Sequence, residues 1–416
     1  MFFNKLKQII SRHKNIVQNL SYLSILQIFI LIAPLITYSH LNHVLGQELY
    51  GLIITAQVLV SYCSLIIDFG SNSVCARHIS INRNDNDKLS EIVSSVLCIR
   101  SALCIICLFL YLIVVLIIPT YRAHLLLFVF FYGITLNEVL FPQYFFQGIE
   151  KMKYSTLINI LIRIVFIALV FITVKSKDDY LWVPLLYTIG YGIGGFVALY
   201  MIFVKMRVNF TRPSIDTMKF YIKDCLAILA TDLICTVKDK LNYLLLGALT
   251  GMGNVVIYDL GLKINALINK PTEIIRVAML PYFANKRDKR QLKKIIMITL
   301  TISSLLVIIA NIFLPQIVDF FINKEIVLWP IRVFSITPVL LSASLIIASN
   351  AFIAWGYNKY ILHSIIITTV VYTISLITMY SLNLLDQLYS FIIIAVISYL
   401  SELIYRLIAF KRINLS

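Results

Sequence analysis

A single apolar stretch, from Tyr258 to Pro281, carries five ionisable residues. These are Asp259, Lys263, Lys270, Glu273 and Arg276. The first four are separated by three, four or seven residues, spacings that place side chains on one face of a helix. At such spacings a carboxylate and a lysine also meet, so we expect Asp259 to pair with Lys263 and Lys270 with Glu273. A face of this kind can hold a charged ligand or exchange an ion.

This charged face allows two interpretations. A charge at the centre of a bilayer costs roughly 2.5–3.5 kcal/mol, so buried charges face protein or a water-filled cavity. The face then either lines a cavity for a charged substrate or forms ion pairs that lock neighbouring helices. Pro271 follows Lys270 and removes a backbone hydrogen bond, which predicts a kink at this point. We favour the cavity wall, because scattered charges seldom align on one face.

Further basic residues occur within apolar segments. They are Arg100, Arg163, Lys238, Lys240 and Arg332. Arg332 lies near a predicted membrane surface, where its long side chain can reach water. Because arginine and lysine bind phosphate oxygens, this cationic interior predicts a substrate that carries phosphate. The predicted substrate-binding residues are Arg100, Arg163, Lys238, Lys263, Lys270 and Arg276.

Four carboxylates are candidates for binding a coupling ion, because burial favours the protonated form of a carboxyl group. For each of them the alternative role is that of a salt-bridge partner to one of the buried cations. The four candidates are Glu138, Asp232, Asp259 and Glu273.

The elements that carry these residues are predicted to be membrane helices. Sixty per cent of the 416 residues are hydrophobic and 13% are charged, against about 25% charged residues in soluble domains. A helix needs roughly 20 apolar residues to span a bilayer. On that basis we predict an all-α polytopic protein with spans at 17–39, 46–69, 89–118, 123–145, 154–174, 180–204, 219–249, 253–280, 294–318, 328–353, 361–384 and 387–409.

The basic residues outside the spans predict the orientation of the chain. If both termini are cytoplasmic, most of these residues lie on the cytoplasmic side, as the positive-inside rule requires. The opposite loops then hold only Arg122, Lys175, Lys177 and Lys324. Six predicted helices precede a cytoplasmic loop and six follow it, with helices 1–6 in 1–204, the loop at 205–218 and helices 7–12 in 219–416.

Several apparent motifs are better explained by packing or by the membrane. Cys104 and Cys107 lie in an apolar run, so we expect buried thiols and neither a metal nor a disulfide. The sequence GYGIGG at 190–195 falls within a span, where its glycines predict close helix contact and not a dinucleotide site. The basic cluster at 285–294 suits a surface of anionic lipid better than nucleic acid. No cofactor is predicted.

Four blocks of the sequence form a recognisable set. They are LGQELYG at 45–51, IIDFGSNSVCARHIS at 66–80, FPQYFFQGIEKMKYSTLINILIRIVFI at 141–167 and AMLPYFAN at 278–285. These blocks resemble the Wzx-type O-antigen flippases. The block at 141–167 is the most specific, and in it Arg163 and the motif Gln147–Lys153 match best. One departure concerns the first two predicted helices. The related lipid II flippases carry basic residues there, and this chain has none.

The resemblance implies a member of the multidrug/oligosaccharidyl-lipid/polysaccharide (MOP) exporter superfamily, with twelve transmembrane helices in two six-helix lobes around a central cavity. It implies a transporter, not an enzyme, that moves undecaprenyl-pyrophosphate-linked repeat units across the bacterial inner membrane by alternating access. Membrane lipids, an H⁺ or Na⁺ gradient, an O-antigen polymerase and a chain-length regulator are the partners expected. Two alternatives stay open: a drug/cation antiporter of the same superfamily, and a membrane-bound polymerase or glycosyltransferase. An antiporter site should be acidic, and such enzymes need a large outer loop.

Overall fold

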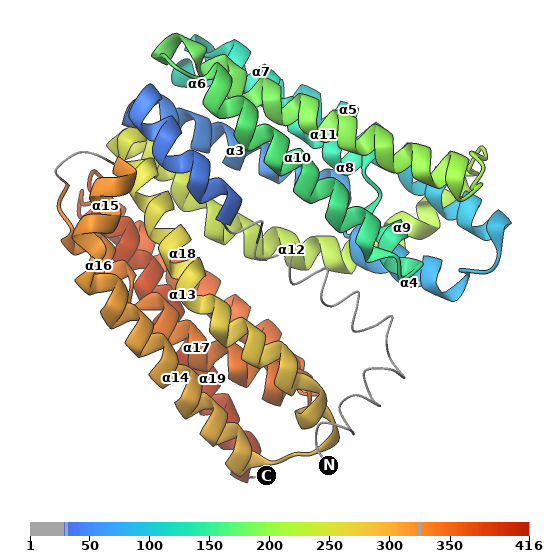
Figure 1. The fold of residues 1–416 in the computed structure, drawn as a ribbon. Coiled ribbons are helices and arrows are strands. Elements are labelled where there is room, and N and C mark those ends of the chain that lie inside the picture. Colours follow the sequence, from blue (N-terminus) through green and yellow to red (C-terminus); the bar gives the residue numbers. More distant parts are fainter. Residues whose placement is uncertain (1–28, 30–31, 323–325, 416) are drawn as a thin grey trace, which may run out of the picture. The chain divides into compact units, whose positions relative to one another are not determined.

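The computed structural model describes residues 29, 32–322 and 326–415 (Figure 1). Within these residues every regular element is a helix, which confirms the predicted all-α class. The chain divides into two compact units, Met1–Gly46 with Ile53–Val237, and Gln47–Leu52 with Lys238–Ser416. Two helices contribute residues to both units.

The first unit has, among its described residues, a helix that covers 32–45. Its further elements are α3 (Gln47–Asp68, shared with the second unit), α4 (Ser71–Ile81), α5 (Asn86–Ile117), α6 (Pro119–Ala123), α7 (Leu125–Tyr132), η1 (Gly133–Thr135), α8 (Leu136–Leu140), α9 (Gln143–Gly148), α10 (Met152–Thr173), η2 (Lys177–Leu181), α11 (Trp182–Tyr200), the π-helix η3 (Met201–Lys205) and α12 (Ile215–Thr250, also shared).

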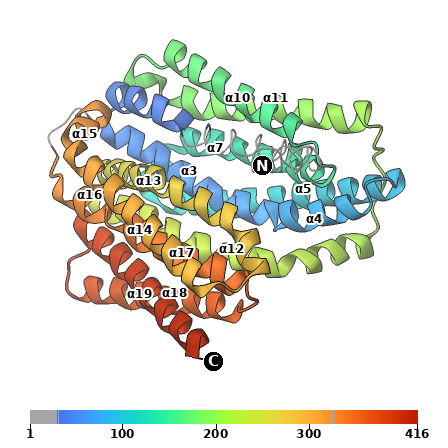
Figure 2. The same ribbon diagram turned by 60° about the horizontal axis from the view of Figure 1, so that its bottom comes forward.

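The second unit holds the remaining helices. They are α13 (Met252–Asn285), α14 (Lys289–Ile312), α15 (Leu314–Ile322), α16 (Trp329–Phe334), α17 (Thr337–Ile347), the π-helix η4 (Ala348–Ile353), α18 (Lys359–Ser381) and α19 (Leu388–Leu415). Helix α17 contacts α13, α14 and α19, and α18 packs along α19 (Figure 2). A hydrophobic core cluster of this unit includes Phe283, Phe352 and Trp355.

Nine helical segments of the described chain are long and apolar enough to cross a membrane, so the protein is a multi-pass membrane protein. Helices α12 and α13, of 36 and 34 residues, match the predicted spans 219–249 and 253–280 but are not among those nine. The predicted span 17–39 lies largely outside the described residues. The count of twelve spans therefore stays a prediction, as do the lobe boundaries and the loop at 205–218.

The structure adds a helix that the predicted spans did not include. Helix α3 ends at Phe69 and Gly70, whose φ angles are 42° and 78°, and the chain then continues directly into α4. Glycine suits this left-handed turn, and a Cβ at Gly70 would lie 3.1 Å from Cβ of Ile228 on α12. Helix α4 forms because Val74, Cys75 and Ile79 give it a buried apolar side.

The block FPQYFFQG, which carries much of the family resemblance, forms part of the core of the first unit. Phe145 and Phe146 are fully buried there, beside residues of α4 and α5. Gly148 ends α9 and touches α4: a Cβ at this position would lie 2.7 Å from the backbone oxygen of Ala76. The motif therefore sets the close packing of α9 on α4.

The glycines of α11 also serve packing. A Cβ at Gly194 would collide with Ile162 of α10, and a Cβ at Gly195 would collide with Leu140 of α8. Helices α10 and α11 accordingly lie side by side in both views (Figures 1 and 2). The sequence at 190–195 is thus a helix-packing motif, as its position within a span predicted.

Candidate functional site

The charged face of α13 contains the two ion pairs that its spacing predicted. Nζ of Lys263 pairs with the carboxylate of Asp259, one turn away, and Nζ of Lys270 lies 2.7 Å from Oε2 of Glu273. Asp259 is buried, whereas the side chain of Glu273 is 44% exposed. The first pair is therefore the more strongly shielded from water, and the second is the more accessible to a ligand.

Beside this face, in the C-terminal half of α13, lie polar groups that the two ion pairs do not use. Nε of Arg276 and Oδ1 of Asn269 are buried, and neither has a hydrogen-bond partner among the described residues. Asn269, Glu273 and Arg276 succeed one another at spacings of four and three, so they project from one side of α13. A buried donor without a partner is costly, and an anionic ligand would satisfy that of Arg276.

Pro271 lies inside α13 without ending it, since the helix runs on to Asn285. The predicted loss of one backbone hydrogen bond is thus accommodated within a continuous helix. The hydroxyl of Thr272, the next residue, is buried and lies 3.2 Å from the hydroxyl of Ser303 on α14. This contact ties the proline segment to the neighbouring helix.

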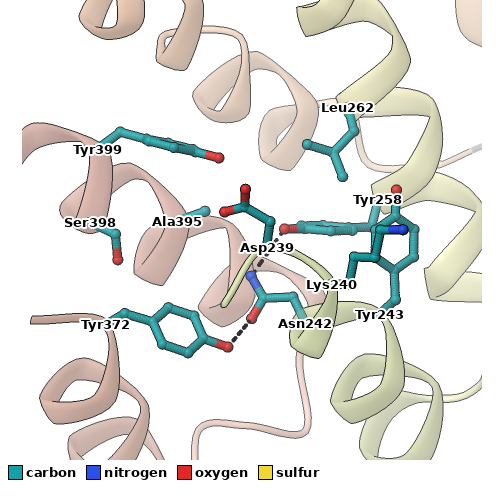
Figure 3. Close-up of a pocket in the computed structure, with 10 residues that line it drawn as sticks. All are labelled: Asp239, Lys240, Asn242, Tyr243, Tyr258, Leu262, Tyr372, Ala395, Ser398 and Tyr399. Carbon is teal, nitrogen blue, oxygen red and sulfur yellow. Dashed lines mark hydrogen bonds between the residues drawn. The ribbon is translucent and has the colours of Figure 1, made fainter. Parts of the chain in front are cut away.

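A cavity of about 250 Å³ lies beside the N-terminal part of α13 (Figure 3). Its lining comes from α12, α13, α18 and α19, and its most frequent residue is tyrosine. We call it the tyrosine pocket, and it is lined by Asp239, Lys240, Asn242, Tyr243, Tyr258, Leu262, Tyr372, Ala395, Ser398 and Tyr399.

Hydrogen bonds hold several of these side chains in place. Nδ2 of Asn242 donates to the hydroxyl of Tyr258 at 3.0 Å, and the hydroxyl of Tyr372 donates to Oδ1 of Asn242 at 2.7 Å. The hydroxyl of Tyr243 donates to Oδ1 of Asp259 at 2.9 Å. The pocket is thereby connected to the ion pair on α13 through a single carboxylate.

In the first unit, Arg100 is bound by protein groups on every side. Its side chain is 1% exposed and forms an ion pair with Asp68 at the end of α3. Nε donates to the hydroxyl of Ser71 at 3.0 Å, and Nη1 donates to the backbone oxygen of Glu138 at 2.5 Å. Its guanidinium also lies over the ring of Tyr144, 5.2 Å from the centroid. In this conformation Arg100 joins α3, α4, α5 and α8, and its predicted role in substrate binding stays a prediction.

The other candidates of the first unit lie in less enclosed positions. Arg163 is half-buried on α10, and its Nε has no hydrogen-bond partner among the described residues. The side chain of Glu138 faces Asn137, whose Nδ2 donates to it at 3.4 Å. Asp232 is half-buried on α12. Lys238, on the part of α12 that belongs to the second unit, has a side chain outside the described part of the structure.

Two buried ion-pair partners were missed from the sequence. Asp68, the partner of Arg100, stood in a segment singled out only for its resemblance. Arg406 falls within the predicted span 387–409 but is not among the basic residues singled out above; it is 5% exposed, and its Nη1 lies 2.5 Å from Oε1 of Glu402. Its Nη1 also donates to the hydroxyl of Ser344 at 2.8 Å. The spacing of four between a glutamate and an arginine in an apolar helix was the available signal.

The described side chains include no cluster of ligands suited to a metal ion. Six cysteines, among them Cys104 and Cys107, are free thiols. The sulfur of Cys104 lies 3.7 Å from the hydroxyl of Tyr132 on α7. These contacts give Cys104 a place in helix packing.

Residues 16–286, more than half of the chain, match the family described as polysaccharide biosynthesis protein. The chain belongs to this family. Its match extends from the first predicted span to the end of α13, so the charged face and most of the first unit lie within it.

The chain is also similar to two curated proteins. A "Putative O-antigen transporter" of Escherichia coli (strain K12) is 30% identical over 162 residues, which are 39% of either chain. A protein of the same name from Shigella dysenteriae is 26% identical over 172 residues, 41% of this chain and 42% of the relative. The chain thus matches only about two fifths of the length of each relative.

Solved structures show the fold. An inward-facing multidrug resistance MATE family transporter of the MOP superfamily superposes with a TM-score of 0.72, covering 92% of this chain and 94% of that one, at 16% identity. A MOP superfamily transporter from Pyrococcus furiosus gives 0.61, with 95% and 93% covered, also at 16% identity. The resemblance to Wzx-type proteins is thereby supported in both family and fold.

Proposed function

We propose that the protein is a flippase for lipid-linked O-antigen repeat units. It moves undecaprenyl-pyrophosphate-linked oligosaccharide from the cytoplasmic to the periplasmic leaflet of the bacterial inner membrane. The family match over 16–286 carries this proposal, since the curated relatives are named O-antigen transporters and the fold is that of MOP transporters. Both termini lie in the cytoplasm, and a polymerase and a chain-length regulator act on the product.

The charged face of α13 supplies the groups that such a substrate needs. The diphosphate binds in the C-terminal half of α13. There the buried Nε of Arg276 has no hydrogen-bond partner among the described residues, and Lys270 is paired with the half-exposed carboxylate of Glu273. Phosphate oxygens compete well with Glu273 for Lys270, because that pair is open to water and therefore weak. Arg276 adds a directional contact to the same anion.

Charge exchange on this face gives a route to ion coupling. When the diphosphate takes Lys270, Glu273 is left without its cation and becomes a site for H⁺ or Na⁺. Asp259 would behave likewise if Lys263 turned to the substrate. Glu138 and Asp232, in the first unit, are the further candidates for coupling. Release of the substrate on the periplasmic side then restores the ion pairs.

A clean deletion tests the function. In a strain with no second flippase, we expect surface O-antigen to disappear and undecaprenyl-linked repeat units to accumulate on the inner leaflet. The wild-type gene on a plasmid should reverse both effects. Normal surface O-antigen in the deletion strain would overturn the proposal.

The α13 face has its own test within that strain. Lys270→Ala and Arg276→Ala should reduce O-antigen export at unchanged membrane levels, and the double substitution should abolish it. Lys289→Ala, an exposed basic residue just after this helix, serves as the control of equal charge change. Export that persists in the double variant would show that this face is structural.

A drug/cation antiporter is the second candidate, since the structure with a TM-score of 0.72 is a multidrug transporter. A charged site for an organic cation should be acidic. On the α13 face each carboxylate is already paired with a lysine, and Arg276 adds a positive charge. Increased sensitivity of the deletion strain to cationic dyes, with O-antigen unchanged, would favour this function instead.

A further inference from the structure

The tyrosine pocket does not include Lys270 or Arg276, the proposed diphosphate-binding residues in the C-terminal half of α13. The proposed diphosphate contact therefore gives the pocket no role. It combines four tyrosine rings from four helices with a carboxylate, an amide and a lysine (Figure 3). We propose that this pocket binds one uncharged sugar ring of the lipid-linked substrate. The inference rests on the proposed function and assigns to it a sugar-recognition site.

The lining suits a sugar because each tyrosine presents an apolar ring and a polar hydroxyl. A pyranose has the same division, with C–H groups on its faces and hydroxyls around its edge. Aromatic rings therefore cover the faces, while hydroxyl, amide and carboxylate groups bind the edge. Tyr243 and Tyr258 meet edge to face, with ring centroids 5.3 Å apart, so they form one corner of the pocket.

The pocket is ordered before any ligand arrives. Asn242 holds Tyr258 through its nitrogen and Tyr372 through its oxygen, and so fixes rings from two helices. The stick view shows Asp239 between Tyr399 and Tyr258, with its carboxylate directed toward the hydroxyl of Tyr399 (Figure 3). A preformed arrangement of this kind loses little conformational entropy when it binds.

The charge of the lining favours a neutral ligand over a cation. Aromatic cages bind organic cations well, and Asp239 taken alone would support such a ligand. Lys240, the next residue, lies in the same lining and balances that charge. A sugar needs both donors and acceptors, which this pair supplies without a net charge.

The size of the pocket favours a single ring. Sites for drug-sized ligands usually enclose roughly 300–1,000 Å³. The tyrosine pocket encloses about 250 Å³, so it is too small for a whole oligosaccharide repeat unit. It would therefore read one sugar and leave the rest of the glycan outside.

The pocket is also coupled to the charged face. Tyr243, in the lining, donates to Asp259, which is the partner of Lys263. A sugar that shifts Tyr243 changes the environment of this ion pair. Recognition of the glycan can in this way influence the charges on α13.

Binding of free sugars to the purified full-length protein tests the inference. Saturation-transfer NMR in lipid nanodiscs would use N-acetylglucosamine, galactose and rhamnose in turn as probes. We expect at least one sugar to bind, and Asp239→Asn and Tyr399→Phe to weaken it about tenfold, as for one lost hydrogen bond. Tyr380→Phe is the matched control, since Tyr380 is 69% exposed on α18 outside the pocket.

Three results of that experiment would overturn the inference. One is the absence of binding by all three sugars. Another is equal binding by the pocket variants and by Tyr380→Phe. The third is binding of tetraphenylphosphonium that depends on Asp239, since it would assign the pocket to organic cations.

Export in cells separates failure of this inference from failure of the proposed function. If the wild-type gene restores surface O-antigen while Asp239→Asn and Tyr399→Phe leave lipid-linked units on the inner leaflet, the pocket is required. If both variants and their combination restore export fully, the sugar site is wrong and the flippase stands. If deletion of the gene leaves export unchanged, the proposed function itself fails, whatever the NMR shows.

Discussion

The carboxylate of Asp259 binds Lys263, one turn further along α13. It also accepts a hydrogen bond from Tyr243 of α12, so one buried side chain joins two helices. The carboxylate has two partners and little contact with water, which makes it sensitive to the loss of either.

Loss of the lysine should therefore destabilise the protein. Lys263→Ala leaves the carboxylate of Asp259 without its cation, and we expect a cost of about 1–3 kcal/mol. Lys270→Ala is the comparison, because its partner Glu273 is half-exposed, and it should cost less than about 1 kcal/mol. Thermal unfolding of the detergent-solubilised variants measures both. Equal losses would contradict the difference in burial between the two pairs.

The contact between Arg100 and Asp68 should be the stronger of the buried pairs tested. Arg100→Ala removes the cation that pairs with Asp68 and the donor to Ser71 and to a backbone carbonyl, and removal of one partner of a buried pair costs about 3–5 kcal/mol. Adding Asp68→Ala should restore part of the lost stability, because the double variant no longer holds an unpaired buried carboxylate. Arg122→Ala, on the exposed surface, is the control. Strictly additive effects in the double variant would argue against the pair.

Two glycines of α11 offer a direct test of helix packing. Gly194→Ala places a methyl group against Ile162 and should destabilise the protein by about 1–3 kcal/mol. Gly192→Ala meets nothing within 4 Å, and it should stabilise the helix by roughly 0.5–1 kcal/mol. We expect Gly194→Ala to lower the melting temperature relative to the wild type and Gly192→Ala to raise it. A neutral Gly194→Ala would show that α10 and α11 are less closely packed.

Asp288 should make the start of α14 depend on pH. Its side chain accepts the backbone N–H of Gln291 at 2.9 Å, and this hydrogen bond lowers the pKa of the carboxyl group. Because the pKa is lower in the folded protein, the stabilisation is present above the unfolded pKa, about 3.9. It is lost as the pH falls through the lower folded value.

Amide exchange at Gln291, followed from pH 6 down to pH 3, measures this effect. Protection should fall with pH in the wild type. Asp288→Asn keeps a capping side chain without a titrating group, so its protection should not show this dependence beyond the intrinsic exchange rate. Identical profiles for the two proteins would exclude a role for the carboxylate.

The positions of the membrane helices could be read from the sequence because hydrophobic length is a local property. Helices α3 and α5 begin and end within about three residues of the predicted spans. The pairing of Lys263 with Asp259 and of Lys270 with Glu273 was equally predictable, since helix geometry alone brings those positions together. The packing role of the GYGIGG segment was also predictable, because the segment lies inside a predicted span.

Contacts between distant segments could not be read in this way. Apolar helices in lipid are similar on all sides, so hydropathy does not say which faces meet. The pairing of Arg100 with Asp68 depends on the turn at Gly70, which brings the end of α3 beside α5. The burial of Arg406 could not be predicted either, because its contact with Ser344 is made with another helix.

The sequence by itself determined the membrane class, the segments that become helices and the charges that share a face, because each depends on residues within a few turns. The tertiary structure alone decided which of those charges have partners and where a pocket forms. Asn242 and Tyr372 are 130 residues apart, and only the packing of α12 against α18 joins them. The tyrosine pocket therefore belongs to the fold and to no single segment of the chain.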